Sequence, residues 1–155
     1  MKSNKILSNI LFLNLIVLVT IIGDFFKNFL PLSFIIILIG YFFLSLGLLT
    51  YEIIQKQIKL LFSKIILLST IVVMGYADFY FKLSRSYSCV FKDNMILSAI
   101  DSIYFSITTF TTTGFGDIYP ISHSAKMFVA SETIFGYILS TFIVAILVIK
   151  FMDEK

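Results

Sequence analysis

The sequence predicts an all-α membrane protein with four transmembrane helices, and three observations carry this prediction. Hydrophobic residues make up 59% of the 155 residues, and charged residues make up only 14%. The mean hydropathy is +1.00, whereas a soluble domain is about half apolar and about a quarter charged. Residues 6–23 and 28–51 contain no charged side chain. Because about 20 helical residues cross the hydrocarbon core of a bilayer, we expect the chain in a membrane.

The same composition argues against several other classes of protein. Four spans and their loops use almost the whole chain, so we expect no soluble catalytic or sensing domain. The net charge is +3, but the basic residues are scattered singly, which is not the pattern of a nucleic-acid site. Cys89 and His123 are the only residues of their kinds, which excludes a cysteine or histidine metal site within one chain. We therefore predict a protein that is not an enzyme and needs no cofactor.

The first two apolar segments, Ile6–Ile22 and Leu32–Tyr51, predict an N-terminal hairpin of two transmembrane helices within residues 1–57. The basic start of the chain also fits a secretory signal, but no small-residue cleavage pattern follows the first segment. The second segment begins just after Pro31, a residue suited to the first turn of a helix. Anchoring, assembly and partner binding all remain open as roles for this hairpin.

The third span is expected over residues 60–81, although only residues 65–77 are free of charge. Lys64 and Asp78 flank that stretch, and we expect both side chains to reach the membrane interfaces. The fourth span is expected over residues 127–149.

A short helix is predicted between the third and fourth spans, over residues 99–111. Ser98 reads as its N-cap, and Asp101 is an acidic residue in the first turn. Thirteen residues extend about 20 Å as a helix, which is too short to cross the bilayer core.

The basic residues predict the orientation of the chain. Positive residues favour the cytoplasmic side, which places both termini in the cytoplasm and residues 82–120 outside. Seven basic residues lie on the predicted cytoplasmic side: Lys2, Lys5, Lys56, Lys59, Lys64, Lys150 and Lys155. Five lie on the other side: Lys27, Lys82, Arg85, Lys92 and Lys126.

Residues 112–117 read Thr-Thr-Gly-Phe-Gly-Asp and lie between the short helix and the last span. This segment resembles the selectivity filter of the potassium channel family, Thr-Val-Gly-Tyr-Gly-Asp. The resemblance covers roughly residues 60–152 and implies a pore domain over residues 58–155. In that domain residues 60–81 are the outer helix, 99–111 a re-entrant pore helix and 127–149 the inner helix. It also implies a homotetramer in the plasma membrane, with potassium ions passing passively through one central filter.

The physical requirement of such a filter matches these residues. A potassium ion enters only if oxygen atoms replace its water shell, and backbone carbonyls that face one axis supply them. This backbone alternates ordinary and positive φ angles, which glycine tolerates, and Gly114 and Gly116 are spaced accordingly. The expected potassium sites are the carbonyls of Thr112, Thr113, Gly114 and Phe115, with the Thr112 hydroxyl. The short helix would direct the negative end of its dipole toward the ions.

Four further residues are expected to support the filter or the gate. Asp117 adds negative potential at the outer mouth and can form a hydrogen bond behind the filter. Thr108 occupies a position where some bacterial pores of this family carry glutamate. Glu132 either braces the pore helix or binds a hydroxyl near the outer interface. Gly136 stands where small bacterial pores carry a hinge glycine, and its alternative role is close helix packing.

Two departures from the family pattern leave alternative functions open. Thr113 replaces the usual Val or Ile, and its hydroxyl is expected to bind Thr108, Asp117 or water. Phe115 replaces the common Tyr, and the chain has no Trp to brace the filter. A weakly selective cation channel and a non-conducting subunit with a pore-like fold are therefore the alternatives. The gating stimulus, a regulatory membrane partner and a Cys89 disulfide between subunits stay open. The high Ile, Phe, Lys and Asn content suggests a bacterial source.

Overall fold

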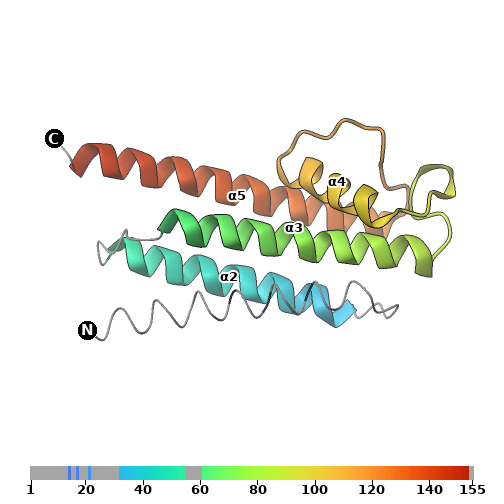
Figure 1. Ribbon diagram of the computed structural model, residues 1–155, viewed down its shortest axis with the longest axis horizontal. Helices are drawn as coiled ribbons and strands as arrows, with labels where there is room; N and C mark the ends of the chain where they lie inside the picture. The colour runs from blue at the N-terminus through green and yellow to red at the C-terminus, as the bar shows by residue number, and fades with distance from the viewer. Residues whose placement is uncertain (1–13, 15–16, 18–20, 22–31, 55–60, 154–155) are drawn as a thin grey trace.

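The computed structural model describes residues 14, 17, 21, 32–54 and 61–153. The predicted first span, residues 6–22, lies almost entirely outside these residues. The described part is helical apart from its loops and one isolated β-bridge (Figure 1). Its elements are α2 (Leu32–Ile54), α3 (Leu61–Ser86), the short 3₁₀ helix η1 (Lys92–Asn94), α4 (Ala99–Phe110) and α5 (His123–Asp153).

The three long helices lie side by side, with α3 between α2 and α5 (Figure 1). The short helix α4 packs on α3 and α5 near the ends where α3 finishes and α5 starts. Among the described helices, Ser63–Ser86 and His123–Val148 are long and apolar enough to cross a membrane. The apolar stretch Ile36–Tyr51 of α2 is shorter. The described part therefore contains two candidate membrane spans and a short helix between them.

Helices α3 and α5 are both longer than the sequence predicted. α3 continues five residues past 81, to Ser86, and α5 begins at His123 rather than at 127. The earlier start of α5 has a local cause, because the Ser122 hydroxyl accepts a hydrogen bond from the Ala125 N–H at 3.3 Å. A serine before the first turn satisfies N–H groups that have no partner inside the helix.

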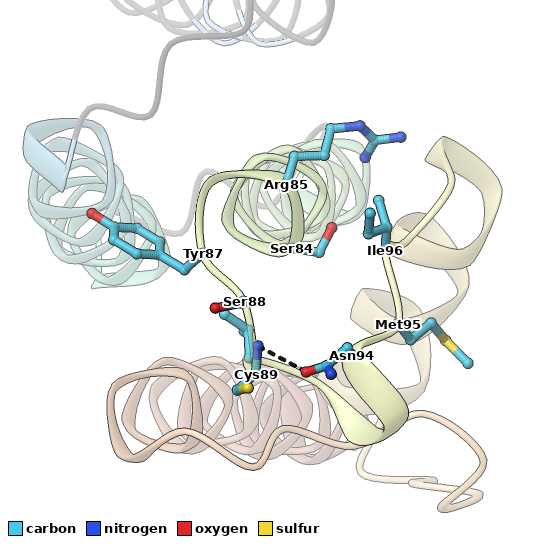
Figure 2. A pocket seen from close by; sticks show the side chains of 9 residues that line it. Ser84, Arg85, Tyr87, Ser88, Cys89, Asn94, Met95 and Ile96 are labelled. Atoms are coloured by element: carbon cyan, nitrogen blue, oxygen red, sulfur yellow. Dashed lines mark hydrogen bonds between the residues drawn. The ribbon is translucent and has the colours of Figure 1, made fainter.

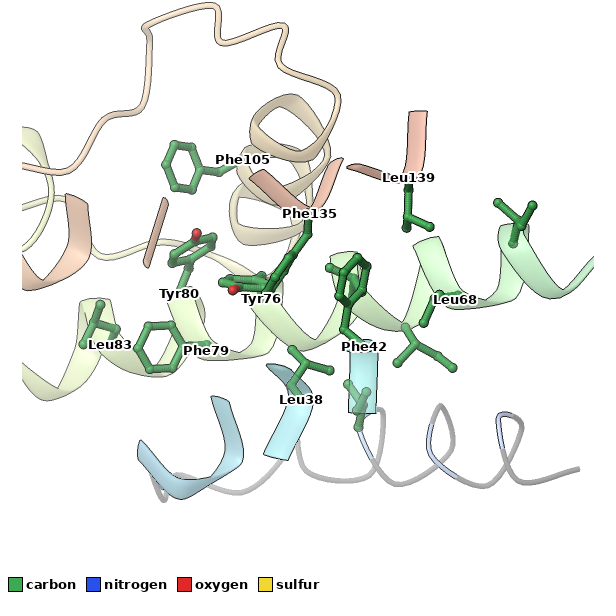
Figure 3. Close-up of a cluster of buried hydrophobic side chains, with 14 of the residues drawn as sticks. Leu38, Phe42, Leu68, Tyr76, Phe79, Tyr80, Leu83, Phe105, Phe135 and Leu139 are labelled. Atoms are coloured by element: carbon green, nitrogen blue, oxygen red, sulfur yellow. The ribbon is translucent and has the colours of Figure 1, made fainter. Parts of the chain in front are cut away.

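An aromatic core joins the helices at their common interface (Figure 3). Phe42 of α2 stacks on Phe135 of α5, with ring centroids 4.3 Å apart. Tyr80 of α3 makes an edge contact with Phe105 of α4 at 5.0 Å. Gly75 of α3 allows a close approach by the Leu38 side chain of α2. These contacts join α2 to α3 and α5, and α4 to α3.

The prediction for Lys64 and Asp78 was wrong, because both are buried by the protein instead of extending to the interfaces. Asp78 is 2% exposed, and its carboxylate pairs with Lys82 one helical turn later at 2.8 Å. Lys64 is also buried. α3 is the central helix, and Lys64, Asp78 and Lys82 are buried along it, whereas Arg85 in its last turn is exposed. An ion pair between residues of one helix compensates the buried charges without contact with water.

Candidate functional site

The short helix α4 begins with the capping box that the sequence predicted. The Ser98 hydroxyl accepts from the Asp101 N–H, and the Asp101 carboxylate accepts from the Ser98 N–H, both at 3.1 Å. Such reciprocal bonds fix where a helix starts. α4 ends at Phe110, one residue before the predicted end, and the chain then loops back to α5 (Figure 1). Residues 111–117 thus leave the C-terminal end of α4, where the helix dipole is negative.

The backbone of this loop alternates in φ. Thr112, Gly114 and Gly116 have φ angles of +57°, +51° and +81°, whereas the residues between them do not have positive φ. Both glycines therefore have the backbone conformation that the filter pattern requires. A β-carbon added at either glycine would meet no atom within 4 Å, so glycine is required here by φ and not by space. Thr112 adopts positive φ despite its side chain, which costs about 1–2 kcal/mol.

Hydrogen bonds tie the start of the loop to the last turn of α4. The Thr108 carbonyl accepts from the N–H groups of Thr113 and Gly114, at 2.9 and 3.2 Å. The Thr112 N–H donates to the Thr109 carbonyl at 3.0 Å. Thr108 therefore contacts the loop through its backbone, while its hydroxyl donates to the Phe105 carbonyl. The position of the loop depends on the position of α4.

The Thr113 hydroxyl binds neither of the two side chains that the sequence predicted, and water as its third expected partner stays a prediction. It lies 2.9 Å from the Thr111 hydroxyl, and neither Thr108 nor Asp117 binds it. The observed contact is local, because only Thr112 separates Thr111 from Thr113 along the chain. Phe115 is 70% exposed in the single chain, and the whole segment from 111 to 117 is open.

Tyr104 is a site residue that the sequence reasoning missed. Its hydroxyl donates to the Asp117 carboxylate at 2.7 Å, and its ring stacks on Phe115 with centroids 6.2 Å apart. The hydroxyl lowers the pKa of Asp117 because it stabilises the ionised carboxylate. Asp117 was expected to form a hydrogen bond behind the filter, and a tyrosine on the short helix predicted over residues 99–111 was the signal that could have identified its partner.

Glu132 and Gly136 lie one turn apart on the face of α5 that meets α4. Glu132 is 0% exposed, and its carboxyl oxygens are hydrogen-bonded to the Tyr80 hydroxyl of α3 at 2.8 Å and to the Ser106 hydroxyl of α4. A β-carbon on Gly136 would lie 1.8 Å from the Phe110 carbonyl oxygen. That distance is far below any real contact, so Gly136 has a packing role. α5 is helical on both sides of it, and its use as a hinge stays a prediction.

The loop that follows α3 and the loop that precedes α5 are joined to each other. Phe91 and Pro120 form an antiparallel β-bridge. The Lys92 N–H donates to the Tyr119 carbonyl at 3.1 Å, and the Ile121 N–H donates to the Val90 carbonyl at 2.8 Å. The segment before α4 therefore holds the segment that follows the filter-like loop.

A cavity of about 300 Å³ lies beside these loops, between the end of α3 and residues 88–96 (Figure 2). Arg85 lines it and donates to the Leu97 carbonyl at 2.6 Å. Cys89 is exposed, its thiol is free within this chain, and its N–H donates to the Asn94 side chain. The described residues contain no group of three His, Cys, Asp or Glu side chains that could hold a metal ion.

Comparisons with known proteins agree with a membrane pore. Residues 65–153, more than half of the chain, match the model of a family described as ion channel. The chain therefore belongs to this ion channel family, an assignment that supports passive ion conduction in a membrane and not catalysis. A 42-residue stretch is 60% identical to an uncharacterized protein of Methanothermus fervidus, covering 27% of this chain and 7% of that protein. No solved structure matches the chain.

Proposed function

We propose that the protein is a potassium-selective channel that conducts K⁺ passively across the plasma membrane as a homotetramer. Residues 112–117 are its selectivity filter, and the carbonyls of Thr112, Thr113, Gly114 and Phe115 hold the ions. The observation that carries this proposal is the alternating positive φ at positions 112, 114 and 116. Alternation of this kind can turn successive carbonyl groups toward one side of the chain, where together they replace the water around a cation.

The surroundings of the loop favour a cation. The C-terminal end of α4 directs its partial negative charge toward the start of the loop. Asp117 follows the filter and, with its pKa lowered by the Tyr104 hydroxyl, keeps a negative charge at the outer mouth. Irregular backbone at membrane depth is tolerated where protein surrounds it or where it lines an aqueous pathway. In the proposed tetramer four copies of this exposed loop would surround one axis, with both termini of each chain in the cytoplasm.

The remaining parts of the chain have supporting roles in this proposal. Residues 58–155 are the pore domain, and the hairpin of residues 1–57 packs outside it in the bilayer. Gly136 contributes close packing with α4 and is the proposed site of bending when the pore opens.

The experiment is a flux assay on the purified protein in liposomes, with potassium and sodium gradients compared in the presence and absence of barium. Potassium flux that barium blocks is expected. Gly114→Ala should abolish it, because alanine at φ +51° is strained. Gly47→Ala is the matched control, since a β-carbon there also meets nothing within 4 Å and no positive φ is involved. Absence of flux from intact tetramers would favour a non-conducting subunit.

A weakly selective cation channel is the second candidate, and the hydroxyl pair of Thr111 and Thr113 favours it. A polar contact beside the filter replaces the apolar packing of the usual Val. Thr113→Val should therefore sharpen the preference for potassium over sodium. An unchanged permeability ratio would remove this candidate.

A further inference from the structure

Three oxygen-to-oxygen contacts connect Glu132, Tyr80, Ser106 and Val73 in the interior of the protein, and two of them involve Glu132. The Tyr80 hydroxyl lies 2.8 Å from one carboxyl oxygen, Oε2. The Ser106 hydroxyl binds the other oxygen, Oε1. The same Ser106 hydroxyl also lies 2.8 Å from the Val73 carbonyl oxygen of α3. This group, called the Glu132 cluster below, joins α3, α4 and α5.

Counting protons shows what the Glu132 cluster needs. Each contact requires one proton between its two oxygens, and each hydroxyl carries one. Tyr80 and Ser106 supply two protons for three contacts, and the Val73 carbonyl has none to give. If Ser106 donates to Val73, the proton of the Glu132 contact must come from the carboxyl group. A protonated Oε1 would donate to Ser106, and all three contacts would then hold one proton each.

The surroundings of the carboxyl group agree with this count. Glu132 is fully buried, and an ionised carboxylate in such a place is costly. The titratable groups that face it are the hydroxyls of Tyr76 and Tyr80 on α3, and α4 contributes the uncharged Ser106. The Tyr76 hydroxyl is bound to Ser131, one residue before Glu132.

We propose that Glu132 is held as a neutral, protonated carboxylic acid, and that this acid is the positioning residue of the pore helix. The carboxylic acid of Glu132 donates a hydrogen bond to the Ser106 hydroxyl, and Ser106 donates one to the Val73 carbonyl. These two bonds link α5 to α4 and α4 to α3. Ser106 lies two residues before Thr108, the residue whose carbonyl holds Thr113 and Gly114. The geometry of the proposed filter thus depends on the protonated state of Glu132 on α5. Only the expected effect of Glu132 on ion selectivity rests on the proposed function.

The first test measures the protonation state directly. The infrared spectrum of the full-length protein in bilayers at neutral pH should contain the carbonyl stretch of a protonated carboxyl group. The band should vanish in Glu132→Gln and should shift in Ser106→Ala, because the proton loses its acceptor. A difference spectrum between wild type and Glu132→Gln without this band overturns the proposal, and so does a band that Ser106→Ala leaves in place. The measurement needs no ion flux, so failure of the proposed function would not be mistaken for failure here.

The second test separates positioning by a neutral acid from mere filling of space. Gln keeps one donor and one acceptor in the geometry of the neutral acid, so Glu132→Gln should retain the potassium-to-sodium flux ratio within about twofold. Glu132→Leu fills similar volume without donor or acceptor and should reduce that ratio about tenfold, with a lower unfolding temperature. Thr133→Val is the control, because the Thr133 hydroxyl binds only its own helix, at Val129. Equal losses in the Gln and Leu variants would overturn the proposal.

Discussion

The two helices long enough to cross a membrane, α3 and α5, are buried to very different extents. In its most apolar stretch α3 is 61% buried within the chain, whereas α5 is only 28% buried. α3 contacts α2, α4 and α5, while α5 contacts mainly α3 and α4 and meets α2 at Phe135. The buried residues of α5 form a narrow stripe that includes Glu132, Phe135 and Leu139. Much of the rest of its surface is apolar and open, with Met127, Ile134, Tyr137, Val144 and Val148 all more than half exposed. Lys126, Ser140 and Thr141 are exposed as well.

The comparison teaches that α3 and α5 have different neighbours. α3 is covered by its own chain and acts as the scaffold on which α4 rests. The described part of the chain leaves one side of α5 open, and in the proposed tetramer that side faces the other subunits and the pore. Substitutions on the buried side of α5 should therefore affect the stability of the single chain, whereas substitutions on its open side should affect it less.

The largest effect is expected from Gly136→Ala, on the buried side of α5. The added carbon would collide with the Phe110 carbonyl, and backbone cannot move aside as a flexible side chain can. We expect loss of the folded protein, measured by size exclusion in detergent and by flux. Gly47→Ala is the control and should be neutral or slightly stabilising, since alanine is favoured over glycine in a helix by about 0.5–1 kcal/mol. A folded Gly136→Ala protein with altered opening alone would mean that Gly136 acts as a hinge and not in packing.

The next largest effect is expected when two leucines of α5 are replaced by alanine and the losses of stability are compared. Leu139 is 1% exposed and Leu147 is 37% exposed within one chain. Leu139→Ala should destabilise the folded chain by about 2–4 kcal/mol, as large-to-small changes in a packed core do. Leu147→Ala should cost clearly less, which denaturant titration in detergent would measure. Equal costs would show that neighbouring chains bury both faces of α5 alike.

A smaller effect is expected from Tyr76→Phe, which weakens the link between α3 and α5. The Tyr76 hydroxyl lies 2.7 Å from the Ser131 hydroxyl. Hydrogen bonds between transmembrane helices contribute about 0.6 kcal/mol on average, so we expect a loss of that order in unfolding free energy. The double variant with Ser131→Ala should lose little more. Fully additive losses would mean that the two hydroxyls are not partners.

The smallest effect should leave both long helices intact and change only a pH response. Tyr104→Phe removes the donor that lowers the pKa of Asp117, so this pKa should rise toward its ordinary value. A lowered pKa keeps the carboxylate charged, and its favourable interaction is lost only as the pH falls through that lowered value. Proton inhibition of flux from the outer side should therefore begin at higher pH in Tyr104→Phe. Tyr119→Phe is the control, and identical midpoints in both variants would contradict the assignment.

Local patterns in the sequence were enough to predict much of the pore region. The capping box of Ser98 and Asp101 placed the start of α4 correctly, because a cap depends on residues three positions apart. Positive φ at Gly114 and Gly116 followed from the spacing of two glycines. The assignment of potassium sites to this loop stays a prediction.

Contacts between distant residues could not be predicted in the same way. Sequence reasoning left two roles open for Glu132, because its partners Tyr80 and Ser106 are 52 and 26 residues away. The collision that makes Gly136 a packing residue depends on where α4 ends. The burial of Asp78 depends on α3 being the central helix, which follows from the packing of all the helices and not from the charge pattern of one.

The bridge between Phe91 and Pro120 has a mechanical consequence. It fastens the end of α3 and the start of α5 to each other, so a tilt of one helix relative to the other must pivot there. α5 has 31 residues and is therefore about 46 Å long. A rotation of about 5° around the bridged end would carry the far end of α5 roughly 4 Å sideways. Small rotations at the bridge are thereby amplified at the C-terminal end of α5, which is the end proposed to be cytoplasmic.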